Sequence, residues 1–133
     1  MSSLELRRDL VILACAISAG IHGALVSAHF GEGTGAGLGF LGATVALAAL
    51  VVALTLRPVG AFALAAAATV LVGLLAGYAL AVTTGLPVLH PQPEPVEGLG
   101  LATKAIEAVG LLAASTLLWR PPVALTVPQP KGT

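Results

Sequence analysis

The sequence predicts an all-α membrane protein, a four-transmembrane-helix bundle that forms a single domain over residues 1–120. Of the 133 residues, 57% are hydrophobic and 9% are charged, whereas soluble domains carry about 25% charged residues. The hydrophobic residues fall into long runs, each near the ~20 residues that cross a bilayer as a helix. Lipid offers no hydrogen-bond partners, and the alternation typical of barrel strands is absent, so these runs are expected to be helices.

The expected spans are 10–30, 36–56, 59–82 and 99–119. The first run continues too far to be a cleaved signal peptide, so it is interpreted as a span. The stretch from 36 to 82 is too long for one crossing, and Arg57-Pro58-Val59-Gly60 divides it, because proline lacks a backbone donor and glycine follows at the turn.

The fourth span is predicted even though it contains Lys104 and Glu107. Each charged side chain costs roughly 2.5–3.5 kcal/mol at a helix centre. Both residues lie in the first half of the span, where a lysine can extend toward the interface. The proline-containing segment 121–133 is expected to be a disordered cytoplasmic tail.

Orientation follows from the basic residues at the N-terminus, in the 2–3 turn and at or beyond the end of the last span. They are Arg7, Arg8, Arg57, Arg120 and Lys131. Because positive charges stay on the cytoplasmic side, both termini are expected in the cytoplasm of a bacterium, with the chain in its inner membrane.

An intramembrane polar set is predicted from His22, Lys104 and Glu107. At 1.5 Å per residue, His22 and Glu107 lie about 12 and 13 Å below the outer interface, on two different helices. A buried carboxylate needs a partner, and His22 and Lys104 are both candidates. The set is interpreted either as a proton or substrate relay or as a structural hydrogen bond between helices.

A second group is expected at the outer surface. His29 shares a helix face with His22, Glu32 lies in the expected loop 31–35, and prolines stiffen the expected loop 83–98. Imidazole and carboxylate ligands suit zinc or copper(II). The predicted metal ligands are His29, His90, Glu32, Glu94 and Glu97.

A haem is a further alternative, held by His22 and its counterpart in a second copy. His22 and His29 cannot bind one iron together, because they project from the same helix face about 10 Å apart.

Small residues mark two faces for close helix contacts. Gly20 and Ala24 lie on the first helix, and Gly73 and Gly77 on the third. Such faces allow helices to approach closely in lipid, either within one chain or in a homo-oligomer or larger membrane complex. The sequence has no basic patch interleaved with aromatic residues, so nucleic-acid binding is not expected.

The sequence has no phosphate-binding loop, no HExxH and no GxSxG motif, so no enzymatic activity is expected. The favoured function is an accessory or binding subunit with an outward-facing His/Glu cluster. The alternative is a small proton-coupled transporter that uses His22, Lys104 and Glu107. Purely structural polar pairs remain a third interpretation.

Three stretches carry a resemblance to a group of small four-span bacterial membrane proteins. They are Gly20-Ile21-His22 through His29-Phe30-Gly31-Glu32, then Gly85-Leu86-Pro87 through Pro93-Glu94-Pro95, then Ala105-Ile106-Glu107. The resemblance implies the four-span topology and no activity. Relatives often place Pro-Glu before the second histidine, where this chain has Ser27-Ala28, and this difference weakens a ligand role for that segment.

Overall fold

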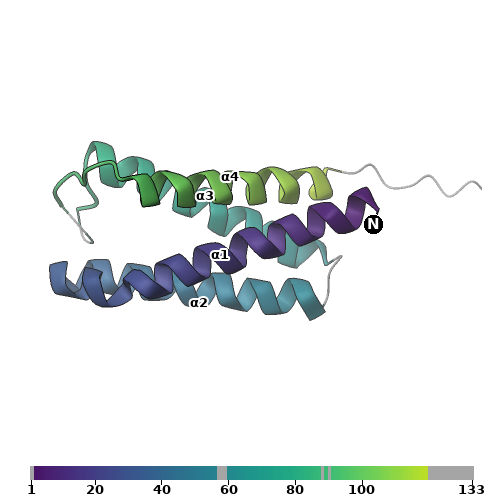
Figure 1. Ribbon diagram of the computed structural model, residues 1–133, viewed down its shortest axis with the longest axis horizontal. Coiled ribbons are helices and arrows are strands. Elements are labelled where there is room, and N and C mark those ends of the chain that lie inside the picture. The colour runs from purple at the N-terminus through teal and green to yellow at the C-terminus, as the bar shows by residue number, and fades with distance from the viewer. Residues whose placement is uncertain (1, 57–59, 88, 90, 120–133) are drawn as a thin grey trace, which may run out of the picture.

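Figure 1 shows the computed structural model, which describes residues 2–56, 60–87, 89 and 91–119. Its helices are α1 (Ser3–Glu32), α2 (Thr34–Leu56), α3 (Ala61–Thr83) and α4 (Gly98–Leu118). All four are long and apolar enough to cross a membrane. The predicted class, an all-α chain with four helices long and apolar enough to span a membrane, is therefore confirmed for this part of the chain. The segment 121–133, together with Arg57, Arg120 and Lys131, lies outside the described residues.

Helix α1 begins at Ser3, well before the expected start at residue 10. A reciprocal pair of hydrogen bonds explains the early start. The Glu5 N–H donates to Ser2 Oγ at 3.2 Å, and the Ser2 N–H donates to Glu5 Oε2 at 2.6 Å. This capping box satisfies backbone donors that the first turn leaves without helical partners, so the helix extends beyond the apolar run.

The connection between α1 and α2 is shorter than predicted, so the expected loop 31–35 is wrong. Only Gly33 separates the two helices. The Gly33 N–H donates to His29 O at 3.0 Å, and the Gly37 N–H donates to Gly33 O at 3.1 Å, which leaves little irregular backbone. The Phe30 ring occupies the place that a Cβ of Gly37 would take, so glycine permits this tight reversal. Glu32 therefore belongs to the last turn of α1.

The bundle is an up-and-down arrangement in which α1 packs against α2 and α4, and α3 packs against α4 and less against α2 (Figure 1). The α1–α4 contact is close at Gly110, where an added Cβ would lie 2.5 Å from the Cβ of Ala14. Glycine thus sets the spacing of these helices, as small residues do in membrane bundles.

The small-residue faces predicted from the sequence are not part of this α1–α4 contact. Gly20 and Ala24 are exposed on α1. A Cβ added at Gly20, Gly73 or Gly77 would meet no atom within 4 Å. These faces therefore do not form the close contacts within the described chain.

The two ends of the bundle differ in character. An apolar core fills the end that holds the N-terminus; it consists of Val11, Cys15, Leu47, Leu50, Leu54, Leu64, Ala67, Leu71, Ala113 and Ala114. The buried polar residues Ser18, His22, Thr103 and Glu107 lie closer to the other end. Large apolar side chains such as Phe62, which is 88% exposed, cover the outside. This surface suits lipid and supports a multi-pass membrane protein.

Candidate functional site

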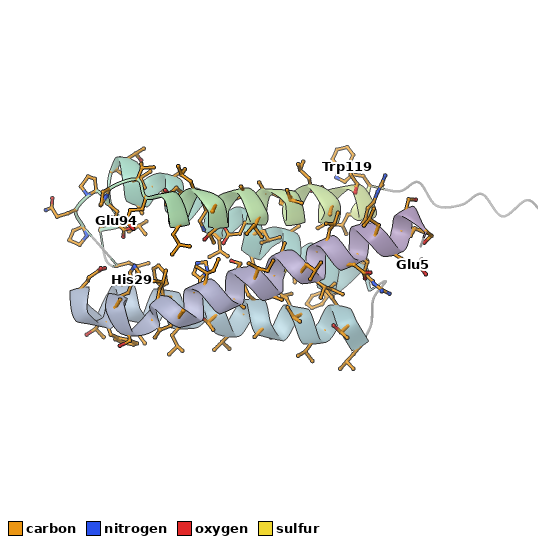
Figure 2. All side chains as sticks on the ribbon, viewed as in Figure 1. Glu5, His29, Glu94 and Trp119 are labelled. Carbon is orange, nitrogen blue, oxygen red and sulfur yellow. The ribbon has the colours of Figure 1, made fainter. Side chains whose placement is uncertain are left out.

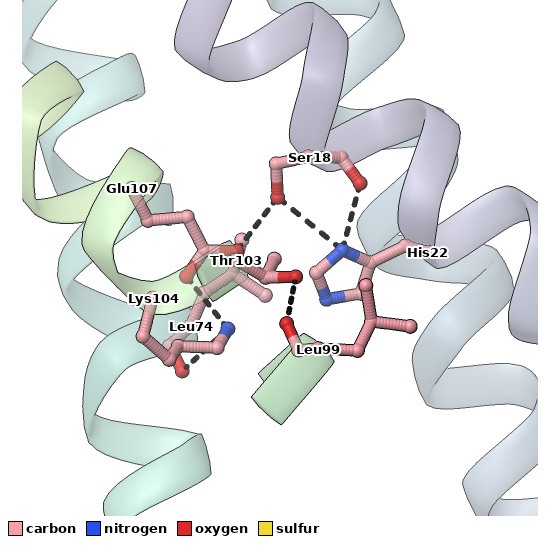
Figure 3. A network of polar contacts seen from close by, with 7 residues as sticks. All are labelled: Ser18, His22, Leu74, Leu99, Thr103, Lys104 and Glu107. Atoms are coloured by element: carbon pink, nitrogen blue, oxygen red, sulfur yellow. Dashed lines mark hydrogen bonds and ion pairs between the residues drawn. The ribbon is translucent and has the colours of Figure 1, made fainter. Parts of the chain in front are cut away.

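Glu107 is fully buried, and both of its carboxylate oxygens have partners (Figure 3). Lys104 Nζ, one helical turn earlier on α4, donates to Oε2 at 2.6 Å. The Ser18 hydroxyl on α1 donates to Oε1, also at 2.6 Å. A buried carboxylate is costly unless it is paired and hydrogen-bonded, and here it is both. Of the two partners considered from the sequence, Lys104 makes the direct contact.

His22 reaches Glu107 only through Ser18. Its Nδ1 lies 2.9 Å from the Ser18 carbonyl oxygen and 3.3 Å from Ser18 Oγ. A carbonyl oxygen only accepts hydrogen bonds, so we assign the Nδ1 atom as the donor, which leaves Nε2 as the acceptor of the neutral ring. The predicted proximity of His22 and Glu107 is therefore bridged by a serine that the sequence analysis did not include in the site.

A cavity of about 580 Å³ lies beside this network, at the end of the bundle away from the N-terminus. All four helices and the segment between α3 and α4 contribute to its wall. The predicted site residues that line it are His22, His29, Glu32, Glu94, Glu97 and Lys104. Glu107 is not among the lining residues, and His90 lies outside the described residues.

The segment that follows α3 folds back to form one wall of this cavity. Gly85 takes a left-handed conformation with φ of 74°, and an added Cβ would lie 2.5 Å from Pro91 O. The Glu94 N–H donates to Ala81 O at 2.9 Å, which ties the segment to the end of α3. Figure 2 shows Glu94 and His29 at this end of the bundle and Glu5 and Trp119 at the opposite end.

The cavity mouth contains His29 in a fixed orientation. Its Nδ1 donates to Leu25 O at 3.0 Å, and its ring stacks on Phe40 with centroids 3.5 Å apart. Its Nε2 lies 3.8 Å from Glu32 Oε2. Across the residues that the structure describes, no group of three His, Cys, Asp or Glu side chains is close enough to hold a metal ion. The geometry thus pairs two of the predicted ligands and brings Glu94 and Glu97 to the same cavity.

Tyr78 on α3 is a site residue that the sequence analysis missed. Its hydroxyl is buried and has no hydrogen-bond partner among the described residues. Lys104 Nζ lies 5.6 Å from the centre of its ring, a distance typical of a cation–π contact. A Cβ on Gly100 would lie 3.1 Å from the hydroxyl oxygen, so glycine leaves room for the tyrosine. The available signal was that this is the one tyrosine of the chain and lies within a span.

No protein-family model, curated protein or solved structure matches this chain. The resemblance to small four-span bacterial proteins therefore stays a prediction.

Proposed function

We propose that the protein is a non-enzymatic accessory or binding subunit of the bacterial inner membrane, with both termini in the cytoplasm, and that its cavity mouth binds a divalent metal ion on the outer side. One observation carries this proposal. His29 and Glu32 on α1 border the same cavity as Glu94 and Glu97, which come from a distant part of the chain. Imidazole and carboxylate groups are ligands suited to zinc or copper(II), and two of them, His29 and Glu32, already lie 3.8 Å apart.

The pair on α1 has a spacing that suits one ion. Zinc bonds of about 2.0–2.2 Å place two ligands of a tetrahedral site about 3.4 Å apart. His29 Nε2 and Glu32 Oε2 are 3.8 Å apart, and the Glu32 side chain is 47% exposed, so a small rotation closes the difference. The hydrogen bond from His29 Nδ1 to Leu25 O orients the other ring nitrogen as the ligand, a common support for metal-binding histidines.

Element analysis tests this proposal. The protein is purified in mild detergent without a metal-affinity step, bound elements are measured by mass spectrometry, and zinc is then titrated. We expect near-stoichiometric zinc or copper, and zinc affinity at least about tenfold lower in His29→Ala and Glu32→Gln, because each removes a direct ligand. The matched control is Asp9→Asn, which removes a carboxylate at the opposite end of α1. Equal zinc affinity in all four proteins would contradict the proposal.

The role of a subunit is supported by the outer face of α1. Ala16, Gly20 and Ala24 are exposed there, four residues apart along one side of the helix. Small residues in this spacing let a second helix approach closely, whether from another copy or from a larger membrane complex.

A proton-coupled carrier is the second candidate. The Ser18 hydroxyl links the buried Glu107 carboxylate to His22, which lines the cavity, so a polar connection leads from the middle of the bundle to one end. Beyond Glu107 the apolar core occupies the rest of the bundle, which favours the binding role in this conformation. A carrier would show acid-driven flux in proteoliposomes that Glu107→Gln abolishes and Asp9→Asn retains. Wild-type flux equal to that of empty liposomes would exclude this candidate.

A further inference from the structure

The cavity as a whole has the size and lining of a small-molecule site, and Gly73, Gly77, Tyr78 and Lys104 line its inner part. The volume of the whole cavity, mouth included, is about 580 Å³, within the roughly 300–1,000 Å³ typical of such sites. Glycine and alanine on α2 and α3 leave the space open; a Cβ added at Gly73 or Gly77 would meet no atom within 4 Å. The wall is largely apolar, with few polar groups, and this pattern favours a molecule that is itself mostly apolar.

The Tyr78 side chain forms part of this wall. The Tyr78 hydroxyl has no hydrogen-bond partner among the residues that the structure describes. Buried polar groups without partners are rare, because each costs free energy when it leaves water. Tyr78 lines the cavity, and its hydroxyl is covered in this conformation. A small shift of the ring toward the cavity would let the hydroxyl donate to an oxygen of a bound molecule.

The neighbouring ammonium adds a second donor. Lys104 Nζ lies 2.6 Å from Glu107 Oε2 and 3.5 Å from Leu74 O, which engages two of its three N–H groups. The formal charges of Lys104 and Glu107 cancel, so this part of the cavity presents hydrogen-bond donors without net charge. A neutral acceptor fits such a wall better than an anion, which would have to lose its hydration without a free countercharge.

We propose that the inner cavity binds a neutral, largely apolar molecule through a carbonyl oxygen that accepts a hydrogen bond from Tyr78, with Lys104 beside it. The ligand class is a membrane-soluble ketone, ester or related carbonyl compound. This inference is independent of the metal proposed for the mouth, since neither Tyr78 nor Lys104 belongs to the proposed metal ligands.

Equilibrium binding of tritiated benzophenone, a neutral diaryl ketone, tests the inference on the full chain in lipid nanodiscs, with empty nanodiscs subtracted. We expect one saturable site per chain. Tyr78→Phe is expected to raise Kd roughly five- to tenfold, the equivalent of one hydrogen bond. The matched control Thr69→Val removes an exposed hydroxyl from the same helix and should leave Kd unchanged. Gly77→Leu should abolish binding by filling the cavity.

Competition identifies the chemistry that the site recognises. Unlabelled 2-undecanone should displace benzophenone, and decanoate, a carboxylate of similar length, should displace it poorly. Three results would each overturn the inference: no saturable binding, the same Kd in Tyr78→Phe as in wild type, or displacement by decanoate as strong as by 2-undecanone. Asp9→Asn, at the opposite end of α1, should leave Kd unchanged. Benzophenone binding is measured without added zinc, so a failed metal experiment and a failed ketone experiment remain distinct.

Discussion

At the scale of single residues, the most unusual feature is a fully buried carboxylate in an apolar bundle, that of Glu107. Glu107 is stabilised by Lys104 on its own helix and by Ser18 on α1. Removing one partner of a buried ion pair leaves an uncompensated charge, whereas removing both charges avoids that penalty. The three residues therefore act as one unit, and their substitutions should not be additive.

This coupling is testable by reversible unfolding in mixed micelles. We expect Lys104→Met to lower the free energy of unfolding by about 3–5 kcal/mol, because it leaves the Glu107 carboxylate without its cation. The double variant Lys104→Met/Glu107→Gln should lose less than Lys104→Met alone. Asp9→Asn, which removes an ion pair with Arg8 in which both side chains are over a third exposed, should cost no more than about 1 kcal/mol. The coupling would be contradicted if the double variant lost as much stability as Lys104→Met and Glu107→Gln lose separately, added together.

The sequence predicted three residues of the site, His22, Lys104 and Glu107, but it did not predict Ser18 or Tyr78. Counting 1.5 Å per residue placed His22 and Glu107 at one depth, and spacing made Lys104 one of two candidate partners of Glu107, the other being His22. The bridge by Ser18 depends on the rotation of α1 against α4, which apolar runs do not specify. The position of Tyr78 depends on the open space at Gly100, a property of packing between α3 and α4.

At the scale of helices, α4 approaches α1 closely at Gly110, where it meets Ala14. The sequence pattern pointed instead to Gly20, Gly73 and Gly77, since small residues four apart are typical of helix contacts. Small residues show where close contact is sterically allowed. Which of these faces is used depends on the packing of all four helices together.

Substitution by alanine, which adds one methyl group, should affect stability differently at Gly110, which packs against α1, and at Gly20, which has open space beside it. Gly110→Ala should lower the free energy of unfolding by about 1–3 kcal/mol, because the new Cβ overlaps Ala14 and forces the helices apart. Gly20→Ala, whose Cβ would meet no atom within 4 Å, should be neutral or stabilising by up to about 1 kcal/mol. The measurement is again unfolding in mixed micelles. Equal effects of the two substitutions would show that α1 and α4 are not in close contact at Gly110.

The ends of the helices were predicted less well than their existence. Apolar runs specify the segments that cross lipid, but hydrogen bonds at the termini decide where a helix begins. The capping box of Ser2 and Glu5 extends α1 outward, and the Phe30–Gly37 contact reduces the α1–α2 connection to one residue. This shorter connection moves Glu32 from a loop onto the helix, one turn from His29.

At the scale of the whole molecule, the bundle is closed and apolar at the end that holds the N-terminus and hollow at the other. The charged and imidazole side chains of the candidate site collect around the hollow end. Both proposals depend on this arrangement, because a metal ion at the mouth and a carbonyl compound inside each need access from one side only.

Labelling of single cysteines tests this arrangement most directly, in a chain with Cys15→Ala as background. Gly77→Cys lies in the cavity wall, about 9 Å from the end of α3 at Thr83. Ala76→Cys, at nearly the same depth, lies on the exposed outer surface of α3. A membrane-impermeant, positively charged methanethiosulfonate reagent should label Gly77→Cys from one side of sealed vesicles and Ser3→Cys from the other, and should spare Ala76→Cys. Equal labelling at residues 76 and 77, or labelling at 77 and 3 from the same side, would contradict the account.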